Sequence, residues 1–116
     1  FSFSLKHYIK KNISIKIQKR VMKQLLEALL EMKRKDIIHR DLKPENVMIR
    51  GKNENTMECV VIDFGLATPA SLEKYIFNRC GTPGFLAPEI AKMSTKKDKL
   101  TPACDMFSLG CIFYRM

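Results

Sequence analysis

Two carboxylates, an amide and an amine near the middle of the chain are the side-chain types that phosphate chemistry uses. Asp41, Lys43 and Asn46 lie close together, and Asp63 follows further along the chain. A carboxylate within hydrogen-bond reach of a hydroxyl can accept its proton. Carboxylate and amide oxygens suit Mg²⁺, and a lysine is a point charge suited to a phosphate oxygen. Taken alone, however, an Asp-x-Lys pair is more often an ion pair on the surface.

These residues lie in four sequence blocks that occur in an informative order. Residues 39–46 read HRDLKPEN, residues 63–65 read DFG, residues 81–89 read GTPGFLAPE, and residues 105–110 read DMFSLG. With these blocks in this order, the sequence resembles the protein kinases. Any one block alone could be a cap, a turn or core packing, but four blocks in register, each in a suitable local structure, favour the resemblance. It covers essentially the whole chain.

The resemblance implies an α+β, protein-kinase-like fold. Residues 1–116 would be one partial kinase domain, namely part of the C-terminal, mainly helical lobe with a small β-hairpin. It would contain the catalytic loop, the magnesium-binding loop, the activation segment and the start of the following long helix. The chain has no Gly-x-Gly-x-x-Gly pattern. We therefore expect the N-terminal lobe and the later C-terminal helices to be absent, and the chain alone not to be catalytically competent.

The activity that the resemblance implies is transfer of the γ-phosphate of ATP to Ser or Thr hydroxyls of proteins, with Mg²⁺ as the metal. In such enzymes Asp41 would be the catalytic base, and Lys43 would contact the transferred phosphate. The hydroxyl of Thr82 would bond toward both of these side chains. The reaction needs an oriented hydroxyl, a held metal and charge stabilisation, which these residue types supply.

The same resemblance assigns the nucleotide and the metal to neighbouring residues. Asp63 and Asn46 would hold magnesium, with Asp63 bridging the metal and the β- and γ-phosphates. Lys43, Glu45 and Met48 would complete the cofactor contacts, Met48 as the floor under the adenine. His39 and Phe64 resemble a stacked apolar spine, Asp105 resembles a buried cap for the catalytic loop, and Glu89 normally pairs with an arginine further downstream.

Three features bear on specificity. The LKPE stretch at residues 42–45, together with Thr82, resembles the serine/threonine branch of the family. Residues 80–85 (CGTPGF) look most like calcium/calmodulin-dependent kinases. Arg115 stands where kinases that prefer basic substrates often carry Glu, although the other usual acidic contact, Glu45, is present. A preference for basic substrates is therefore in doubt.

Activation is the other property on which the resemblance bears. In many relatives the residue equivalent to Arg40 pairs with a phosphate on the activation loop. The customary acceptor position here is Asn78, with Arg79 beside it, so we expect control by a regulatory segment or protein outside this chain. Three other acceptors in the loop stay open, and these are Thr68, Ser71 and Tyr75.

Helical periodicity predicts the elements that would support the catalytic loop. Residues 14–35 are expected to form a long amphipathic helix with Ser14 as its N-cap, after a short helix over residues 4–11. Its apolar positions are Ile17, Val21, Leu25, Leu29 and Met32, widened by Met22, Leu26 and Leu30. A second long helix should start near Pro102, with the proline in its first turn.

Two apolar runs, residues 47–49 and 59–62, flank a polar turn over residues 50–58 and predict a small hairpin. The stretch from Asp63 to Pro88 has no clear periodicity. We expect a long, mostly irregular loop there, and loops of this length are usually functional.

Composition narrows the class of protein and leaves alternatives open. The net charge is +9, but no aromatic residues interleave the Lys and Arg clusters for base stacking, so no nucleic acid is expected as a partner. A basic nucleic-acid module remains an alternative on charge alone, and a truncated or pseudokinase-like binding module remains another. No apolar run is long enough to span a membrane, and the four cysteines are expected to be reduced thiols. We expect a cytoplasmic or nuclear location.

Overall fold

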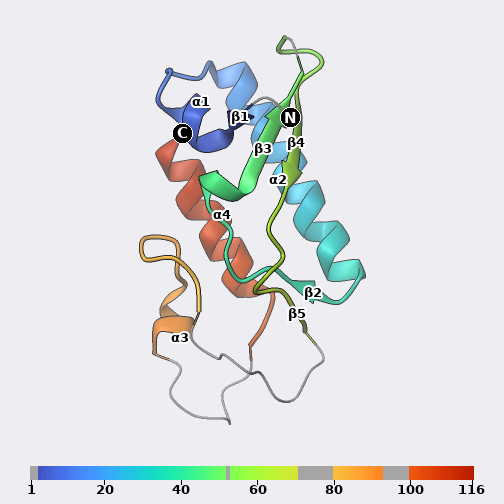
Figure 1. Ribbon diagram of the computed structural model, residues 1–116, viewed down its shortest axis with the longest axis vertical. Coiled ribbons are helices and arrows are strands. Elements are labelled where there is room, and N and C mark those ends of the chain that lie inside the picture. The colour runs from blue at the N-terminus through green and yellow to red at the C-terminus, as the bar shows by residue number, and fades with distance from the viewer. Residues whose placement is uncertain (1–2, 52, 71–79, 93–99) are drawn as a thin grey trace.

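The computed structural model describes residues 3–51, 53–70, 80–92 and 100–116. Figure 1 shows how the elements are arranged, with α2 and α4 as the two long helices of this part of the chain. The elements are β1 (Phe3–Ser4), α1 (Leu5–Ile9), α2 (Ile15–Arg34), β2 (Ile37–Ile38), the 3₁₀ helix η1 (Pro44–Asn46), β3 (Val47–Arg50), β4 (Glu58–Val61), β5 (Thr68–Pro69), α3 (Pro88–Ala91) and α4 (Ala103–Arg115). The mixture of helices and small antiparallel sheets is the α+β class that the sequence predicts.

Helix α2 forms where its periodicity predicts. The hydroxyl of Ser14 accepts a hydrogen bond from the backbone N–H of Ile17 at 3.3 Å, which confirms the N-cap. The face that is buried carries Val21, Leu25 and Met32. The outer part of the apolar stripe is not buried, since the side chains of Leu26 and Leu30 are 43% and 50% exposed.

The predicted hairpin consists of β3 and β4, and it gains a third strand. Met48 pairs with Val60 across the hairpin and with Ser4 on its other side, so the antiparallel order is β1-β3-β4. The turn needs a glycine at Gly51, because its φ is 115° and a Cβ there would lie 2.6 Å from the carbonyl oxygen of Thr56. Strand β1 was not predicted, since two residues carry no periodicity.

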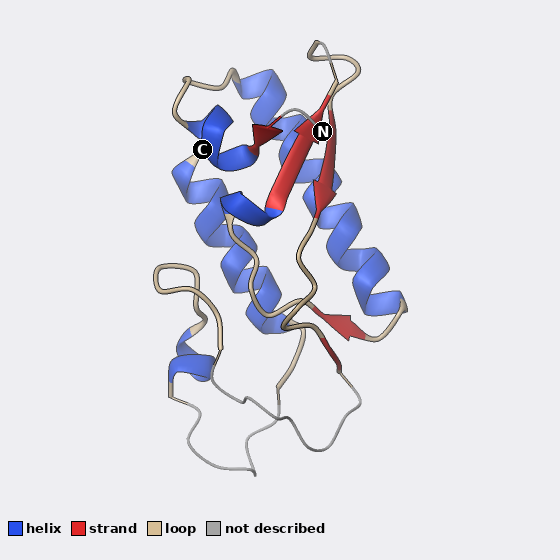
Figure 2. Ribbon diagram, viewed as in Figure 1, coloured by secondary structure: helices blue, strands red, loops and turns tan. Residues whose placement is uncertain are grey.

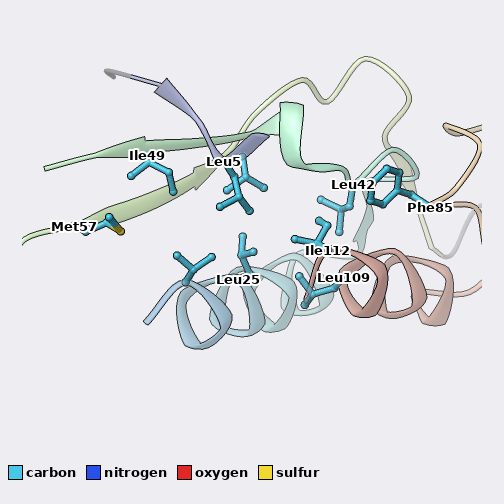
Figure 3. Packing of buried hydrophobic residues seen from close by; sticks show 10 residues of the cluster. Leu5, Leu25, Leu42, Ile49, Met57, Phe85, Leu109 and Ile112 are labelled. Carbon is cyan, nitrogen blue, oxygen red and sulfur yellow. The ribbon is translucent and has the colours of Figure 1, made fainter. Parts of the chain in front are cut away.

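A large apolar cluster lies between this sheet and the two long helices (Figure 3). Its buried members are Leu5, Val21, Leu25, Leu42, Val47, Ile49, Met57, Phe85, Leu109 and Ile112. Gln24 of α2 ties the helix to the sheet, because its amide donates to the carbonyl oxygen of Met57 at 3.0 Å and accepts from the N–H of Cys59 at 2.6 Å. Helix α2 and the sheet are therefore joined by apolar packing and by polar contacts.

A small apolar cluster lies at the other end of α4. Its buried members are Ile38, Ala87, Ile90, Leu100 and Cys104. Ile38 belongs to β2, which pairs with β5 in a two-stranded sheet separate from the first (Figure 2). The prediction of a long, mostly irregular stretch from Asp63 to Pro88 did not include the two-residue strand β5, which is recruited by a partner about thirty residues away.

The remaining sequence predictions concern helix ends, cysteines and membranes. Helix α1 matches the short helix that was predicted, and α4 begins with Pro102 at its N-cap position, one residue before the first turn in which it was expected. The four cysteines are free thiols. Within the ranges the structure describes, no helix is both long and apolar enough to cross a membrane.

Candidate active site

The backbone of residues 39 and 40 is held by a buried carboxylate on α4. Asp105 is 2% exposed, and its two oxygens accept hydrogen bonds from the N–H of His39 at 2.8 Å and of Arg40 at 3.0 Å. Burial raises the pKa of the Asp105 carboxyl, and the two backbone N–H groups oppose that shift. Arg40 has a φ of 74°, a left-handed conformation that side chains rarely adopt. The expected cap on the catalytic loop is confirmed.

His39 connects this loop to the strand that precedes Asp63. Its ring nitrogen Nε2 lies 2.9 Å from the carbonyl oxygen of Ile62, and Nδ1 accepts from the N–H of Asp41 at 3.1 Å. These two contacts assign the neutral tautomer with the proton on Nε2. The ring also meets Phe64 edge to face at 4.8 Å between centroids, so the expected pairing of these two rings is present.

Asp41, Lys43 and Thr82 form a closed triangle of polar contacts. The hydroxyl of Thr82 donates to Oδ1 of Asp41 at 2.7 Å, and Nζ of Lys43 donates to the same hydroxyl at 2.9 Å. The lysine Nζ lies 3.4 Å from Oδ2 of Asp41. The side chains of Asp41 and Lys43 are only 14% and 22% exposed, so their charges are poorly screened by water. The structure thus brings together a carboxylate, a cation and a hydroxyl from segments about forty residues apart.

Asn46 and Asp63 lie beside this triangle. The amide nitrogen Nδ2 of Asn46 donates to the carbonyl oxygen of Asp41 at 2.9 Å, which leaves its Oδ1 to serve as a ligand. The N–H of Ile62 donates to the carbonyl oxygen of Asn46 at 2.9 Å, so Asp63 is the next residue along from this contact. Asp63 is exposed and has a φ of 60°, and its Oδ1 accepts from the N–H of Gly65 at 3.2 Å.

The chemistry of this pair fits magnesium. Magnesium is usually bound through one or two carboxylates, with waters and substrate phosphates filling its other positions. Asp63 provides an exposed carboxylate and Asn46 an oriented amide oxygen, which is such a partial set. Among the described residues no three His, Cys, Asp or Glu side chains gather as a complete protein cage. The pair is therefore suited to a metal shared with a phosphate ligand.

Glu45 and Met48 lie on the same stretch but outside the triangle. Glu45 is half-buried in η1, and its side chain forms no hydrogen bond or ion pair with another residue in the described ranges. Met48 is half-buried in β3, between Ser4 and Val60. Both residues are close in sequence to Asp41 and Asn46. Among the described residues, neither side chain makes a polar contact with Asp63.

The segment that carries Thr82 is fixed to α4 and to the catalytic loop. The hydroxyl of Ser108 donates to the carbonyl oxygen of Phe85 at 2.6 Å. Gly81 has a φ of 132°, and a Cβ there would lie 2.8 Å from Leu86 and 3.1 Å from the carbonyl oxygen of Arg40. Only a glycine permits this close approach without strain. Ser108 was not singled out from the sequence, because a serine inside an apolar helix resembles ordinary packing.

Arg115 is a second feature that the fold adds. Its guanidinium lies over the ring of Phe85 at 4.5 Å from the centroid, and its Nη2 would be 3.1 Å from a Cβ on Gly84. The end of α4 thus reaches the turn that follows Thr82. Sequence analysis placed Arg115 at a position concerned with specificity, but its contacts with Phe85 and Gly84 come only from the structure.

The residues tied to activation are only partly described. Asn78, Arg79, Ser71 and Tyr75 lie outside the described residues. Thr68 is 8% exposed in β5 and pairs with Ile38, so it is a poor acceptor in this conformation. Arg40 donates from Nε to the carbonyl oxygen of Leu66 at 2.6 Å. Its predicted phosphate partner stays a prediction.

Comparison with known proteins finds one matching family and many similar sequences. The family model described as protein kinase domain matches residues 2–116. The chain is 37% identical over 95 residues to calcium-dependent protein kinase 4 of Plasmodium falciparum, covering 82% of this chain and 17% of that protein. It is 39% identical over 109 residues to the serine/threonine-protein kinase cds1 of Schizosaccharomyces pombe, covering 84% of this chain and 21% of that protein. The chain therefore spans about a fifth of the length of these relatives.

Proposed function

The chain belongs to the protein kinase family, and we propose that it is the central part of the larger, mainly helical lobe of a serine/threonine kinase. In the complete protein this lobe would work with a second lobe that grips ATP. Its activity would be transfer of the γ-phosphate of ATP to Ser or Thr hydroxyls of protein substrates. The likeness to relatives named as serine/threonine kinases supports this proposal, as do the LKPE residues at 42–45 and the position of Thr82.

The observation that carries the proposal is the triangle of Asp41, Lys43 and Thr82. The hydroxyl of Thr82 donates a hydrogen bond to Oδ1 of Asp41 at 2.7 Å, which fixes the orientation of the carboxylate. The other oxygen, Oδ2, lies near the amine of Lys43. A carboxylate held in this way can orient a substrate hydroxyl and accept its proton. The amine of Lys43 supplies a fixed positive charge, which stabilises charge on a phosphoryl group most where water is scarce.

The metal and the nucleotide would bind next to this triangle. We assign magnesium to Asp63 and to Oδ1 of Asn46, and nucleotide contacts to Lys43, Glu45 and Met48. When bound, magnesium would neutralise charge on the phosphates and hold them in place. The contribution of the chain itself is orientation, because the hydrogen bond from Asn46 to the carbonyl of Asp41 couples the metal ligand to the proposed base.

Two substitutions in the complete kinase test the assigned roles. Asp41→Asn and Asp63→Asn should each lower kcat by on the order of 10³-fold, because each removes a charged group from the reacting centre. Asp41→Asn should keep nucleotide affinity measured with magnesium present, whereas Asp63→Asn should lose it. The control is Glu27→Gln, an exposed residue of α2, which should leave both quantities unchanged.

The outcomes separate the proposal from its rivals. Equal loss of nucleotide affinity in both variants would contradict the division of roles. A parent protein that binds nucleotide but transfers no phosphate to any protein would identify a binding module of the pseudokinase type. Labelling of a generic substrate protein by residues 1–116 alone would contradict the further proposal that this chain needs a second lobe.

The proposal extends to the partners and the location of the complete kinase. The partners would be ATP, protein substrates with Ser or Thr acceptors, and a regulatory segment or protein beyond this chain. We infer a cytoplasmic or nuclear location from the four free thiols, which a reducing compartment would preserve. Fractionation of cells that express a tagged form of the complete kinase would test this location.

A further inference from the structure

Gln24 is a half-buried amide on α2 that pairs with the backbone at the start of β4. Its Nε2 donates to the carbonyl oxygen of Met57 at 3.0 Å, and its Oε1 accepts from the N–H of Cys59 at 2.6 Å. In the described part of the chain, β4 pairs with a strand, β3, on one edge only, and it lies against α2 (Figure 1). An amide side chain offers a donor and an acceptor together, as a peptide group does. Gln24 therefore takes the place of a neighbouring strand on the second edge of β4.

These hydrogen bonds lie where water cannot easily replace them. Met57 is 5% exposed, and burial raises the pKa of the Cys59 thiol to about 11, a shift that the charge of Arg20 opposes. Nε of Arg20 also donates to the carbonyl oxygen of Met57, at 2.8 Å. Loss of the glutamine amide would thus leave the N–H of Cys59 without its partner, whereas the carbonyl oxygen of Met57 would keep the bond from Arg20. A poorly hydrated N–H that loses its partner is destabilising, so this edge of β4 would be held less firmly.

Strand β4 runs directly into the proposed metal site. It pairs with β3 from Glu58 to Val61, and the next residue, Ile62, donates its N–H to the carbonyl oxygen of Asn46 at 2.9 Å. Asp63 follows Ile62, so one continuous segment joins the edge held by α2 to both proposed metal ligands. Extended backbone transmits a displacement along its length, because each residue has a nearly fixed rise. The place of β4 on α2 therefore contributes to the place of Asp63 beside Asn46.

From these contacts we propose that Gln24 is a positioning residue for magnesium, because by fixing β4 on α2 it sets the Asp63 carboxylate relative to Oδ1 of Asn46. This inference rests on the proposed function, and it adds a residue outside the four sequence blocks that carry the family resemblance. Groups that orient a metal ligand without touching the metal change the metal affinity by about 10–100-fold when they are replaced. Gln24 acts from further away, through the strand, so its effect should be smaller and confined to the magnesium-dependent part of nucleotide binding.

The experiment uses the complete kinase and a non-hydrolysable ATP analogue. Calorimetry gives the dissociation constant of the analogue in excess magnesium chloride and again in EDTA, and the ratio of the second constant to the first reports the contribution of the metal. Gln24→Met keeps the length of the side chain but removes both hydrogen bonds, and it should lower this ratio about fivefold. An unfolded fraction of protein lowers the number of binding sites but not the ratio, so a loss of stability alone would not change it.

Two further variants make the test specific. Gln24→Glu keeps an acceptor for the N–H of Cys59, so its ratio should lie closer to that of the parent, and this variant keeps the test valid if Gln24→Met does not fold. Gln18→Met is the matched control. Gln18 is a glutamine of the same helix whose Nε2 donates to the carbonyl oxygens of Ile13 and Met116 at 3.0 and 3.1 Å, and neither residue belongs to β4. Gln18→Met should keep the parent's ratio.

Amide hydrogen exchange shows whether the strand edge has opened, since the N–H of Cys59 should exchange faster in Gln24→Met than in the parent. A lowered ratio in Gln24→Met together with the parent's ratio in Gln18→Met establishes the inference. Faster exchange at Cys59 with an unchanged ratio, or an equal fall in both glutamine variants, overturns it while leaving the proposed function intact. A parent whose affinity for the analogue does not depend on magnesium would overturn the proposed metal site, and the inference with it.

Discussion

The large and the small apolar clusters hold the two ends of the segment that carries the proposed base, and they are built differently. The large cluster joins α2, the three-stranded sheet and α4, elements that each have their own periodic pattern. The small cluster joins β2, the residues around α3 and the start of α4, and most of these have no repeating pattern. The catalytic loop runs from Ile38 in the small cluster to Val47 in the large one. The proposed base therefore depends on both clusters.

This difference teaches where precision in the site comes from. The large cluster supplies most of the buried apolar area, which is the main favourable term in folding. The small cluster contributes less area but holds Ala87, and it shares with the large cluster, which holds Phe85, the segment that delivers Thr82 to Asp41. Asp105 links the two clusters. Its carboxylate accepts hydrogen bonds from two backbone N–H groups that no described helix or strand pairs.

The largest expected effect comes from removing that carboxylate. Asp105→Ala leaves the buried N–H of His39 and the part-buried N–H of Arg40 unpaired, each at about 1–3 kcal/mol, so the free energy of unfolding of the complete kinase should fall by about 4 kcal/mol. Denaturant unfolding measures this. Glu27→Ala, an exposed acid on α2, should change it by less than about 0.5 kcal/mol. A small loss for Asp105→Ala would mean that the two clusters hold the loop without the cap.

Next in size is a direct comparison of the clusters. Ile112→Ala in the large cluster should lower the free energy of unfolding by about 3 kcal/mol, since a fully buried side chain leaves a cavity. Ile90→Ala in the small cluster should cost about 2 kcal/mol, because the surrounding irregular segments can relax into the space. Its loss of kcat should nevertheless be the larger of the two. The reverse order in kcat would break the proposed division between stability and positioning.

The same division separates what the sequence predicts from what it does not. Helix α2, the hairpin of β3 and β4, and α4 follow from patterns contained within each element. The pairing of β2 with β5 does not, because two-residue strands about thirty residues apart leave no local signal. Pairing between short strands far apart in the sequence depends on the packing of the whole fold, so the strand propensity of the residues does not predict it.

For the site, residue types were predictable and geometry was not. The motifs identified Asp41, Lys43, Asn46, Asp63 and Thr82, and the contacts among most of them are present in the structure. The left-handed backbone at Arg40 and Asp63 has no sequence signal, since neither residue is a glycine. Such conformations persist only where surrounding contacts impose them. Here these are the hydrogen bond that Arg40 donates to Asp105 and the one that Asp63 accepts from Gly65.

A smaller effect is expected from the triangle itself. Thr82→Val keeps the shape of the side chain but removes the hydroxyl that joins Asp41 to Lys43, so kcat of the complete kinase should fall about tenfold. Thr82→Ser restores a hydroxyl and should keep most of the activity. Steady-state kinetics at saturating ATP measures both. Equal activity of the Val and Ser variants would show that the hydroxyl of residue 82 does not contribute to turnover, and that this segment matters only for packing.

The smallest effect concerns the pH dependence that Asp105 confers. Burial raises its folded-state pKa above the ordinary value of 3.8, and the two N–H groups keep that rise partly in check. Below pH 3.8 the carboxyl is protonated whether the protein is folded or unfolded. As the pH rises past that value the unfolded chain releases its proton first, which favours unfolding, and the contribution is fully lost above the folded-state pKa.

The free energy of unfolding of the parent, minus that of Asp105→Asn, should therefore fall as the pH rises from acid toward neutrality. Subtraction cancels the carboxylates that the two proteins share, and Glu27→Gln, treated in the same way, should give a flatter difference. A difference that rises with pH would show that the two backbone N–H groups outweigh burial, and that the link between the clusters is strongest when Asp105 is charged.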